Sequence, residues 1–148
     1  MISHRETRFV PYPAELMYRV VSDVEQYPQF LPWVVALRVL SRAENHLTAE
    51  MAVGYGALRE RYTSDIRLDP AARRVDVAQI AGPFKTLENH WHFIPQGKSC
   101  DIEFSIQFEF KSRLLHSVAG AKFEKVLMKM ADAFEARAKA IQDRGDVA

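Results

Sequence analysis

The chain has a single cysteine, no uninterrupted apolar run of membrane-spanning length and almost no net charge. The lone Cys100 excludes an intramolecular disulfide and any zinc site built from four cysteines, and it is typical of a reducing compartment. The longest apolar run, from Phe30 to Leu40, is interrupted by Pro32 and Arg38 and is too short to cross a bilayer. A net charge of +1 gives no extended basic field, so we do not expect DNA as a partner.

The length of the chain and its first residues bear on its organisation. At 148 residues we expect one domain over residues 1–148, large enough to bury about two thirds of its unfolded surface. Neither a signal-peptide core nor an Arg- and Ser-rich transit segment precedes the first predicted strand, so we expect a cytoplasmic protein, with at most peripheral contact at the inner face of the membrane.

Sequence motifs of the common enzyme classes are also missing. There is no GxGxxG, P-loop, HExxH or GxSxG. Cys100 lies on the apolar side of its predicted strand, where the thiolate form is disfavoured. His90 and His92 share one side of a strand with Glu88 and could bind zinc, but that side is the polar one, where a solvated histidine pair is commoner. We therefore expect no catalytic residue and no metal ligand.

The clearest pattern in the chain runs from residue 99 to residue 142. Between Cys100 and Phe110 every even position is apolar and every odd position is polar, which predicts a strand with one buried and one solvated face. Ser112 then supplies an N-cap, and apolar residues recur at helical spacing from Leu115 to Ile141. An unbroken helix of this length would be roughly 45 Å long, enough to lie across a whole sheet.

The preceding part of the chain predicts a strand, two short helices and five more strands. In order, these elements are expected at residues 2–10, 14–24, 24–30, 33–41, 47–55, 58–68, 74–80 and 84–94. Because short turns pair neighbouring strands antiparallel, this order predicts an α+β fold in which a curved seven-stranded antiparallel sheet wraps around the long C-terminal helix. Such an architecture encloses a cavity, which indicates a protein that binds apolar molecules.

Three features leave alternatives open. The small residues 119–121 either let the helix pack close to the sheet or leave space there for a ligand. Glu60 falls on the apolar register of its strand, so its carboxylate lies either at a frayed strand end or inside the cavity. The proline-rich segment from Tyr27 to Trp33 is stiff, and it either plugs the core or forms a rim that touches a membrane.

Five segments carry a resemblance to a known family. They are VPYPAELMYRVVSDVEQYPQFLPW (10–33), RYTSDIRL (61–68), GPFKTLENHWHF (82–93), IEFSIQFEF (102–110) and FEKVLMKMADAFEARAK (123–139). These segments are similar to the coenzyme Q-binding START proteins of the polyketide cyclase/dehydrase-like superfamily, over roughly residues 2–142. The resemblance implies a helix-grip (START/Bet v 1-like) fold with a deep hydrophobic tunnel between the sheet and the C-terminal helix.

Two branches of this family resemble the chain. One is the mitochondrial coenzyme Q chaperone, which binds ubiquinone and supports respiratory electron transport, and the other is a bacterial toxin that interferes with ribosomal subunit association. Trp33 is more similar to the first branch, whereas Val34 replaces the cysteine that both branches often carry. The resemblance implies non-enzymatic chaperoning of ubiquinone or a similar polyprenyl lipid. A ribosome-associating, toxin-like role is the alternative, and a polyketide cyclase or aromatase is a further one.

The residues expected to line the tunnel come from the apolar faces of the strands and the long helix. They are Trp33, Val35, Met51, Val53, Tyr62, Phe84, Leu87, Trp91, Phe104, Phe108, Val118, Val126, Leu127 and Met130. Candidates for transient membrane contact are Phe30 and Leu31 in the stiff segment, with Lys122, Lys125 and Lys129 on the helix. Ubiquinone or a related isoprenoid lipid is expected as a ligand and not as a catalytic cofactor. The expected partners are this hydrophobic small molecule, a membrane surface and, in the alternative, the ribosome.

Overall fold

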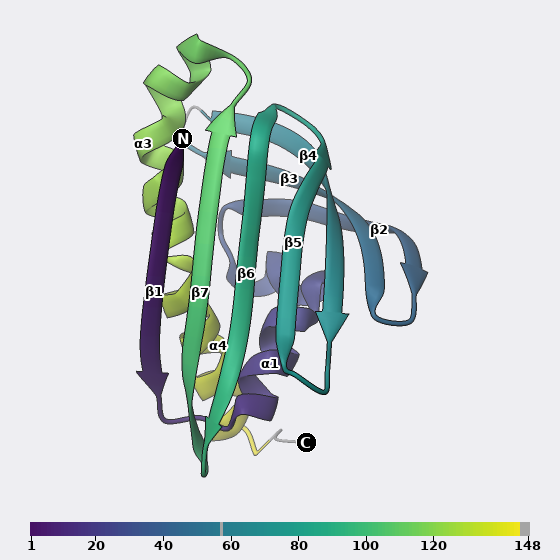
Figure 1. Ribbon diagram of the computed structural model, residues 1–148, viewed down its shortest axis with the longest axis vertical. Helices are drawn as coiled ribbons and strands as arrows, with labels where there is room; N and C mark the ends of the chain where they lie inside the picture. The colour runs from purple at the N-terminus through teal and green to yellow at the C-terminus, as the bar shows by residue number, and fades with distance from the viewer. Residues whose placement is uncertain (57, 146–148) are drawn as a thin grey trace.

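The computed structural model describes residues 1–56 and 58–145, and in them one seven-stranded antiparallel sheet carries its helices on one side (Figure 1). The strands are β1 (Ile2–Val10), β2 (Val34–Ala43), β3 (His46–Tyr55), β4 (Leu58–Asp69), β5 (Arg74–Ala81), β6 (Phe84–Gln96) and β7 (Ser99–Phe110). The helices are α1 (Ala14–Ser22), the 3₁₀ helix η1 (Val24–Gln26), α2 (Tyr27–Phe30), α3 (Arg113–Met128) and α4 (Met130–Asp143). The strand order is β1-β7-β6-β5-β4-β3-β2, so the first strand lies beside the last.

Strand β7 has the alternation that its sequence predicts. Its even positions from Cys100 to Phe110 are all buried, and its odd positions are half-buried or exposed. β1 pairs with it along the whole of β1, from Val10 opposite Cys100 to Ile2 opposite Phe108, and β6 pairs with its other edge. The buried positions of β7 therefore form the middle of one continuous apolar sheet face.

The helices cover this apolar, concave face, and the opposite face is open to solvent. Figure 1 shows α1, α3 and α4 behind the same side of the sheet. Arg8 of β1 reaches α4, where its Nη1 lies 2.6 Å from an oxygen of Asp132 and 3.4 Å from an oxygen of Glu135. Arg73, after β4, pairs with Glu15 of α1. These ion pairs join two places on the sheet to the helices that cover it.

The C-terminal helix is divided at Lys129, so the prediction of one unbroken helix is wrong. Its start is as predicted, because Ser112 Oγ accepts a hydrogen bond from the Leu115 N–H at 3.1 Å. At Lys129 the backbone N–H donates to the carbonyl of Val126 at 3.1 Å, an i to i−3 bond that tightens one turn. No glycine or proline marks this position, and therefore the sequence pattern gives no signal for the break.

The small residues of α3 allow close packing. Ala119 and Gly120 are buried and Ala121 is exposed. A Cβ atom added to Gly120 would lie only 3.3 Å from Cδ1 of Ile2 in β1, tighter than ordinary van der Waals contact. Of the two readings of this segment, the structure favours the one in which the helix approaches the sheet.

Aromatic rings fill the part of the concave side formed by β6 and β7. Phe84 stacks on Phe110 with ring centroids 4.6 Å apart, and Phe123 of α3 lies 5.1 Å from Phe108. Further along, Trp91 stacks on Phe104 at 4.6 Å and meets the edge of Phe134 from α4 at 5.1 Å. Such interlocked rings leave little free volume in this part of the molecule.

Candidate functional site

The candidate site is a cavity on the concave side of β2 to β6, closed by α2 and by the segment around the α3–α4 junction. It is lined by Val24, Tyr27, Leu31, Trp33, Val34, Ala49, Met51, Val53, Tyr62, Ser64, Ile66, Val77, Leu87, Asn89, Phe123, Val126, Leu127 and Met130. The sheet supplies the floor, because alternate residues of neighbouring strands share one face. Three residues of the α3–α4 segment, Val126, Leu127 and Met130, stand opposite as an apolar wall.

The cavity is small, with a volume of about 50 Å³. Sites for small ligands usually have volumes of roughly 300–1,000 Å³. A molecule with a ring and an isoprenoid tail therefore needs some lining side chains to move, and the flexible thioethers of Met51 and Met130 are suited to that.

Eight of the residues predicted to line a tunnel do border the cavity. They are Trp33, Met51, Val53, Tyr62, Leu87, Val126, Leu127 and Met130. Four more, Phe84, Trp91, Phe104 and Phe108, lie on the predicted concave face but are packed into the aromatic cluster and do not border the cavity. The sequence pattern thus located the face correctly without showing which part of it is open.

Two predicted lining residues point into solvent, and their assignment to the cavity is wrong. Val35 is 65% exposed because a β-bulge lies there: Val34 pairs with Val53 and Ala36 with Ala52, so Val35 is the extra residue. Val118 is also 65% exposed. At about 100° per residue it lies on the far side of the helical stripe that the buried Ala119 and Phe123 define.

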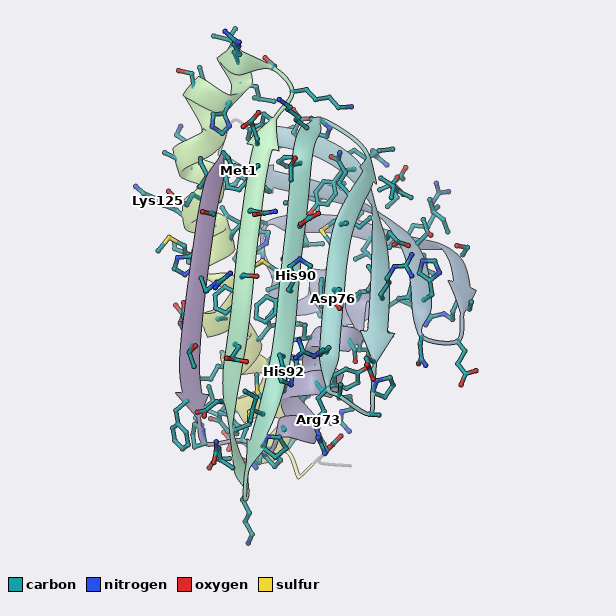
Figure 2. The ribbon with its side chains drawn as sticks, in the orientation of Figure 1. Met1, Arg73, Asp76, His90, His92 and Lys125 are labelled. Atoms are coloured by element: carbon teal, nitrogen blue, oxygen red, sulfur yellow. The ribbon has the colours of Figure 1, made fainter. Side chains whose placement is uncertain are left out.

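The stiff segment is a plug, and the membrane role predicted for Leu31 is wrong. Leu31 is 1% exposed and lines the cavity, because α2 turns its side chain inward. Phe30 is half-buried, with its ring 5.9 Å from that of Phe134 and the guanidinium of Arg137 5.1 Å above it. The other membrane candidates, Lys122, Lys125 and Lys129, are exposed, and Figure 2 shows Lys125 projecting away from the sheet.

Polar residues in the cavity were missed at the sequence level, although a signal for them exists. Ser64 lies between Tyr62 and Ile66 on the apolar register of β4, and Asn89 lies between Leu87 and Trp91 on that of β6. Both line the cavity. A polar residue on the apolar register of a predicted strand signals a side chain that points into the cavity. Above, this signal is applied only to Glu60. Also missed were Val24, Tyr27, Val34, Ala49, Ile66, Val77 and Phe123.

Glu60 shares the concave face but lies at the rim. It pairs with Val53, whose side chain lines the cavity, and paired residues of antiparallel strands point to the same side. Glu60 itself is half-buried and does not border the cavity. Its carboxylate therefore stands at the end of the strand, on the inward side.

The histidines of β6 point to the outer face of the sheet, as Figure 2 shows. His90 Nδ1 lies 2.6 Å from Asp76 Oδ1, and His92 Nδ1 lies 3.3 Å from Glu103 Oε1. Within residues 1–56 and 58–145, no three His, Cys, Asp or Glu side chains are grouped so that they could hold a metal ion. Cys100 is fully buried, and burial raises the pKa of its thiol to about 11.

No helix in the described part of the chain is both long and apolar enough to span a membrane.

Comparisons with known proteins agree over most of the chain. A family profile described as polyketide cyclase / dehydrase and lipid transport matches residues 10–135. The ribosome association toxin RatA of Rickettsia prowazekii is 33% identical over 144 residues, which cover 95% of this chain and 99% of that protein. The mitochondrial coenzyme Q-binding protein COQ10 homolog B of Xenopus laevis is 34% identical over 150 residues, covering 99% of this chain and 62% of that protein.

Solved structures share the fold. The 18 kDa protein CC1736 of Caulobacter crescentus is 37% identical, with a TM-score of 0.77 over 97% of this chain and 99% of that one. A START superfamily protein of Mycobacterium smegmatis matches with a TM-score of 0.75 at 22% identity, over 94% and 98%. The Zhui aromatase/cyclase of Streptomyces matches with a TM-score of 0.85 at 17% identity, over 95% of this chain and 94% of that one. The helix-grip fold predicted from the sequence is confirmed, and the chain belongs to the polyketide cyclase / dehydrase and lipid transport family of START-like proteins.

Proposed function

We propose that this protein binds ubiquinone or a similar prenylated quinone in its cavity and carries it without catalysing a reaction. The observation that carries the proposal is the cavity, whose lining is apolar apart from a few neutral polar groups. Its lining, taken over the described residues, includes no carboxylate, imidazole, amine or thiol. The phenols of Tyr27 and Tyr62 are the titratable groups in that lining, and burial raises the pKa of both, so they stay protonated. This favours a binder over a polyketide cyclase or aromatase.

Burial of the isoprenoid tail supplies the affinity. Each Å² of apolar surface removed from water contributes about 25 cal/mol, and the wall of Val126, Leu127 and Met130 offers only apolar contacts. Because the cavity is small, we expect the ligand to enter by displacing the side chains of Met51 and Met130. A carrier of this kind would work in the cytoplasm and meet its ligand at the inner face of the membrane.

Organic-solvent extraction of the purified protein, followed by mass spectrometry, tests this proposal. We expect a prenylated quinone to be recovered with the wild type and much less of it with Val53→Phe, in which a ring occupies the cavity. Val35→Phe, which adds the same ring on the solvent side of β2, is the matched control and should retain the lipid. Recovery of no lipid, or of equal amounts from Val53→Phe and Val35→Phe, would contradict the proposal.

A second candidate function is association with the ribosome. The relatives named ribosome association toxins align over nearly their whole length, whereas the chain spans 62% of the coenzyme Q-binding relative, so the relatives favour this role over quinone carriage. A specific surface also supports it. The α3 outer face consists of Leu114, Val118, Lys122, Lys125 and Lys129, which are all exposed and follow one helical stripe. The ribosome would contact the α3 outer face, whereas the quinone would bind in the cavity. The two roles therefore use different residues.

Co-sedimentation with separated ribosomal subunits tests the second candidate. We expect the wild type to sediment with one subunit, and a Val118→Ser, Lys122→Glu, Lys125→Glu variant to remain in the supernatant. Arg38→Glu, which reverses an exposed charge on β2, is the control and should sediment like the wild type. Equal sedimentation of all three proteins would exclude the α3 outer face as the contact.

The α3 outer face also replaces Phe30 and Leu31 as the candidate for transient membrane contact. Leu114 and Val118 are 75% and 65% exposed, and each nearby lysine contributes about 1 kcal/mol at an anionic surface. Flotation with anionic liposomes should weaken as salt is raised, and it should weaken again in Lys122→Glu, Lys125→Glu. Flotation that is insensitive to both changes would exclude the α3 outer face as the membrane contact.

A further inference from the structure

Two polar side chains are buried in the apolar floor of the cavity. Ser64 is 3% exposed and Asn89 is 9% exposed, and they are the buried polar residues of the part of the chain that the structure describes. Ser64 Oγ has no hydrogen-bond partner among those residues. A buried hydroxyl without a partner costs free energy, so its presence at this place calls for a partner that enters from the cavity.

The amide of Asn89 is held with its NH₂ group free. Its Oδ1 accepts a hydrogen bond from Trp91 Nε1 at 2.8 Å. Because an indole N–H can only donate, the oxygen of the amide must face Trp91 and the nitrogen must face the other way. None of the described residues accepts a hydrogen bond from this nitrogen. Asn89 therefore presents to the cavity an N–H donor whose orientation is fixed by Trp91.

The cross-strand neighbours of these two residues offer them no hydrogen bond. Ser64 pairs with Ala49 of β3, whose side chain has no polar atom, and the Ser64 hydroxyl is buried without a partner among the described residues. Asn89 pairs with Val77 of β5, an apolar residue that also lines the cavity. The opposite wall, from α3 and α4, is apolar. The cavity therefore has a polar strip on the sheet side and hydrocarbon on the helix side.

We propose that Ser64 and Asn89 form a head-group site that selects an uncharged ligand bearing hydrogen-bond-accepting oxygens, such as the carbonyl oxygens of a quinone. The side chains that line the cavity carry no charge, and an anionic head group would lose its hydration there without a positive charge to pair with. The ring would lie against the sheet with its oxygen toward Ser64 Oγ or Asn89 Nδ2, and its tail would follow Val126, Leu127 and Met130. This site rests on the proposed binding of a hydrophobic ligand, whose head-group chemistry it specifies.

Three probes with tails of nine or ten carbons separate head-group recognition from tail burial. Decylubiquinone has carbonyl oxygens, decylbenzene has none, and decanoate carries a charge. Calorimetric titration of the wild type should rank decylubiquinone first and decanoate last. Ser64→Ala should weaken decylubiquinone binding about fivefold to tenfold and leave decylbenzene binding unchanged. Ser105→Ala, the same substitution on the outer face of β7, should alter neither.

The fold of the empty protein gives an independent measurement. Because Ser64→Ala removes an unpartnered buried hydroxyl, we expect this variant to have a higher melting temperature than the wild type in the absence of ligand. Asn89→Asp keeps an oxygen for Trp91 and removes the NH₂ donor, so it should reject decylubiquinone. A lower melting temperature for Ser64→Ala would show that the folded protein itself uses the hydroxyl, and would overturn the proposal.

The outcomes distinguish this site from the proposed function. If Ser64→Ala binds decylubiquinone as tightly as the wild type does, the head-group site is wrong while hydrophobic binding stands. Tighter binding of decanoate than of decylubiquinone would also overturn the uncharged selectivity alone. If the wild type binds none of the three probes, both the head-group site and the proposed function fall.

Discussion

The concave side of the sheet has a filled region and a hollow region, although the same strand pattern produces both. The filled region comprises the concave side of β1, β7 and the adjoining ends of β5 and β6, where the rings of Trp91 and Phe104 stack 4.6 Å apart. The hollow region comprises the concave side of β2, β3 and β4 with Val77 of β5 and Leu87 and Asn89 of β6. In this region Ala49 and Ser64 face each other across a strand pair. The period of the pattern identifies the buried face, and side-chain volume decides whether that face is filled.

Matched isoleucine truncations should show the largest difference between the two regions. Ile102 is fully buried in the filled region, and Ile66 lines the cavity in the hollow region. Ile→Ala substitutions cost about 2–5 kcal/mol, with the highest values where the surroundings cannot relax. We expect Ile102→Ala near the top of this range and Ile66→Ala near the bottom, measured by urea denaturation. Equal losses would show that the hollow region is packed like a core.

Cysteine alkylation should separate the regions by reaction rate. The pKa of Cys100, in the filled region, is raised by burial from 9.0 to about 11, which reduces the thiolate fraction at pH 8 about a hundredfold. Iodoacetamide should therefore modify Cys100 only through unfolding, whereas a Met51→Cys thiol beside the cavity should react faster and be protected by decylubiquinone. Mass spectrometry of the time course gives both rates. Similar rates at the two sites would remove this distinction.

Matched valine enlargements should show a smaller difference between the two regions, in the same direction. In the filled region Val75 is 0% exposed, and Val75→Phe should cost about 1–3 kcal/mol through overpacking. In the hollow region Val53→Phe should cost less than about 1 kcal/mol, because the ring enters existing space. The same variant should lose decylubiquinone. If Val53→Phe unfolds like Val75→Phe, Val53 belongs to the core and the ligand site lies elsewhere.

The strand alternation was sufficient to predict the fold and the concave face. Met51, Val53 and Tyr62 border the cavity because a period of two allows only one side to be buried. The pattern failed at Val35, because nothing in the sequence signals the single extra residue of a β-bulge. The prediction for Leu31 failed for another reason, because prolines show that a segment is stiff but do not show which way its side chains point.

The chemistry of the cavity was only partly predictable. The polar residues Ser64 and Asn89 interrupt an apolar register, so their inward position can be read from the sequence. Their missing partners cannot be read, since a hydrogen bond such as that from Trp91 Nε1 to Asn89 Oδ1 depends on rotamers. The division of the C-terminal helix at Lys129 also lies outside the pattern, because the apolar stripe passes through it unchanged.

The smallest effect is expected on the outer face of the hollow region. Asp65 of β4 is bound by His46 of β3, and its Oδ2 accepts a hydrogen bond from Arg67 Nε at 3.2 Å. The hydrogen bond with His46, with contributions from both positive charges, lowers the pKa of Asp65 below its ordinary 3.8. A carboxyl group with a lowered folded-state pKa stabilises the protein above its unfolded-state pKa, and this contribution is lost as the pH falls through the folded-state value.

Asp65→Asn should therefore lower the free energy of unfolding by less than about 1 kcal/mol at pH 7, as partly exposed ion pairs do. The difference from the wild type should begin to shrink as the pH falls to about 4, since the unfolded state then takes up the proton first. Urea denaturation at pH 7, 4 and 3 measures the trend, and a cycle with His46→Ala isolates the pair. A difference that stays constant over this range would show that Asp65 acts through packing and not through its charge.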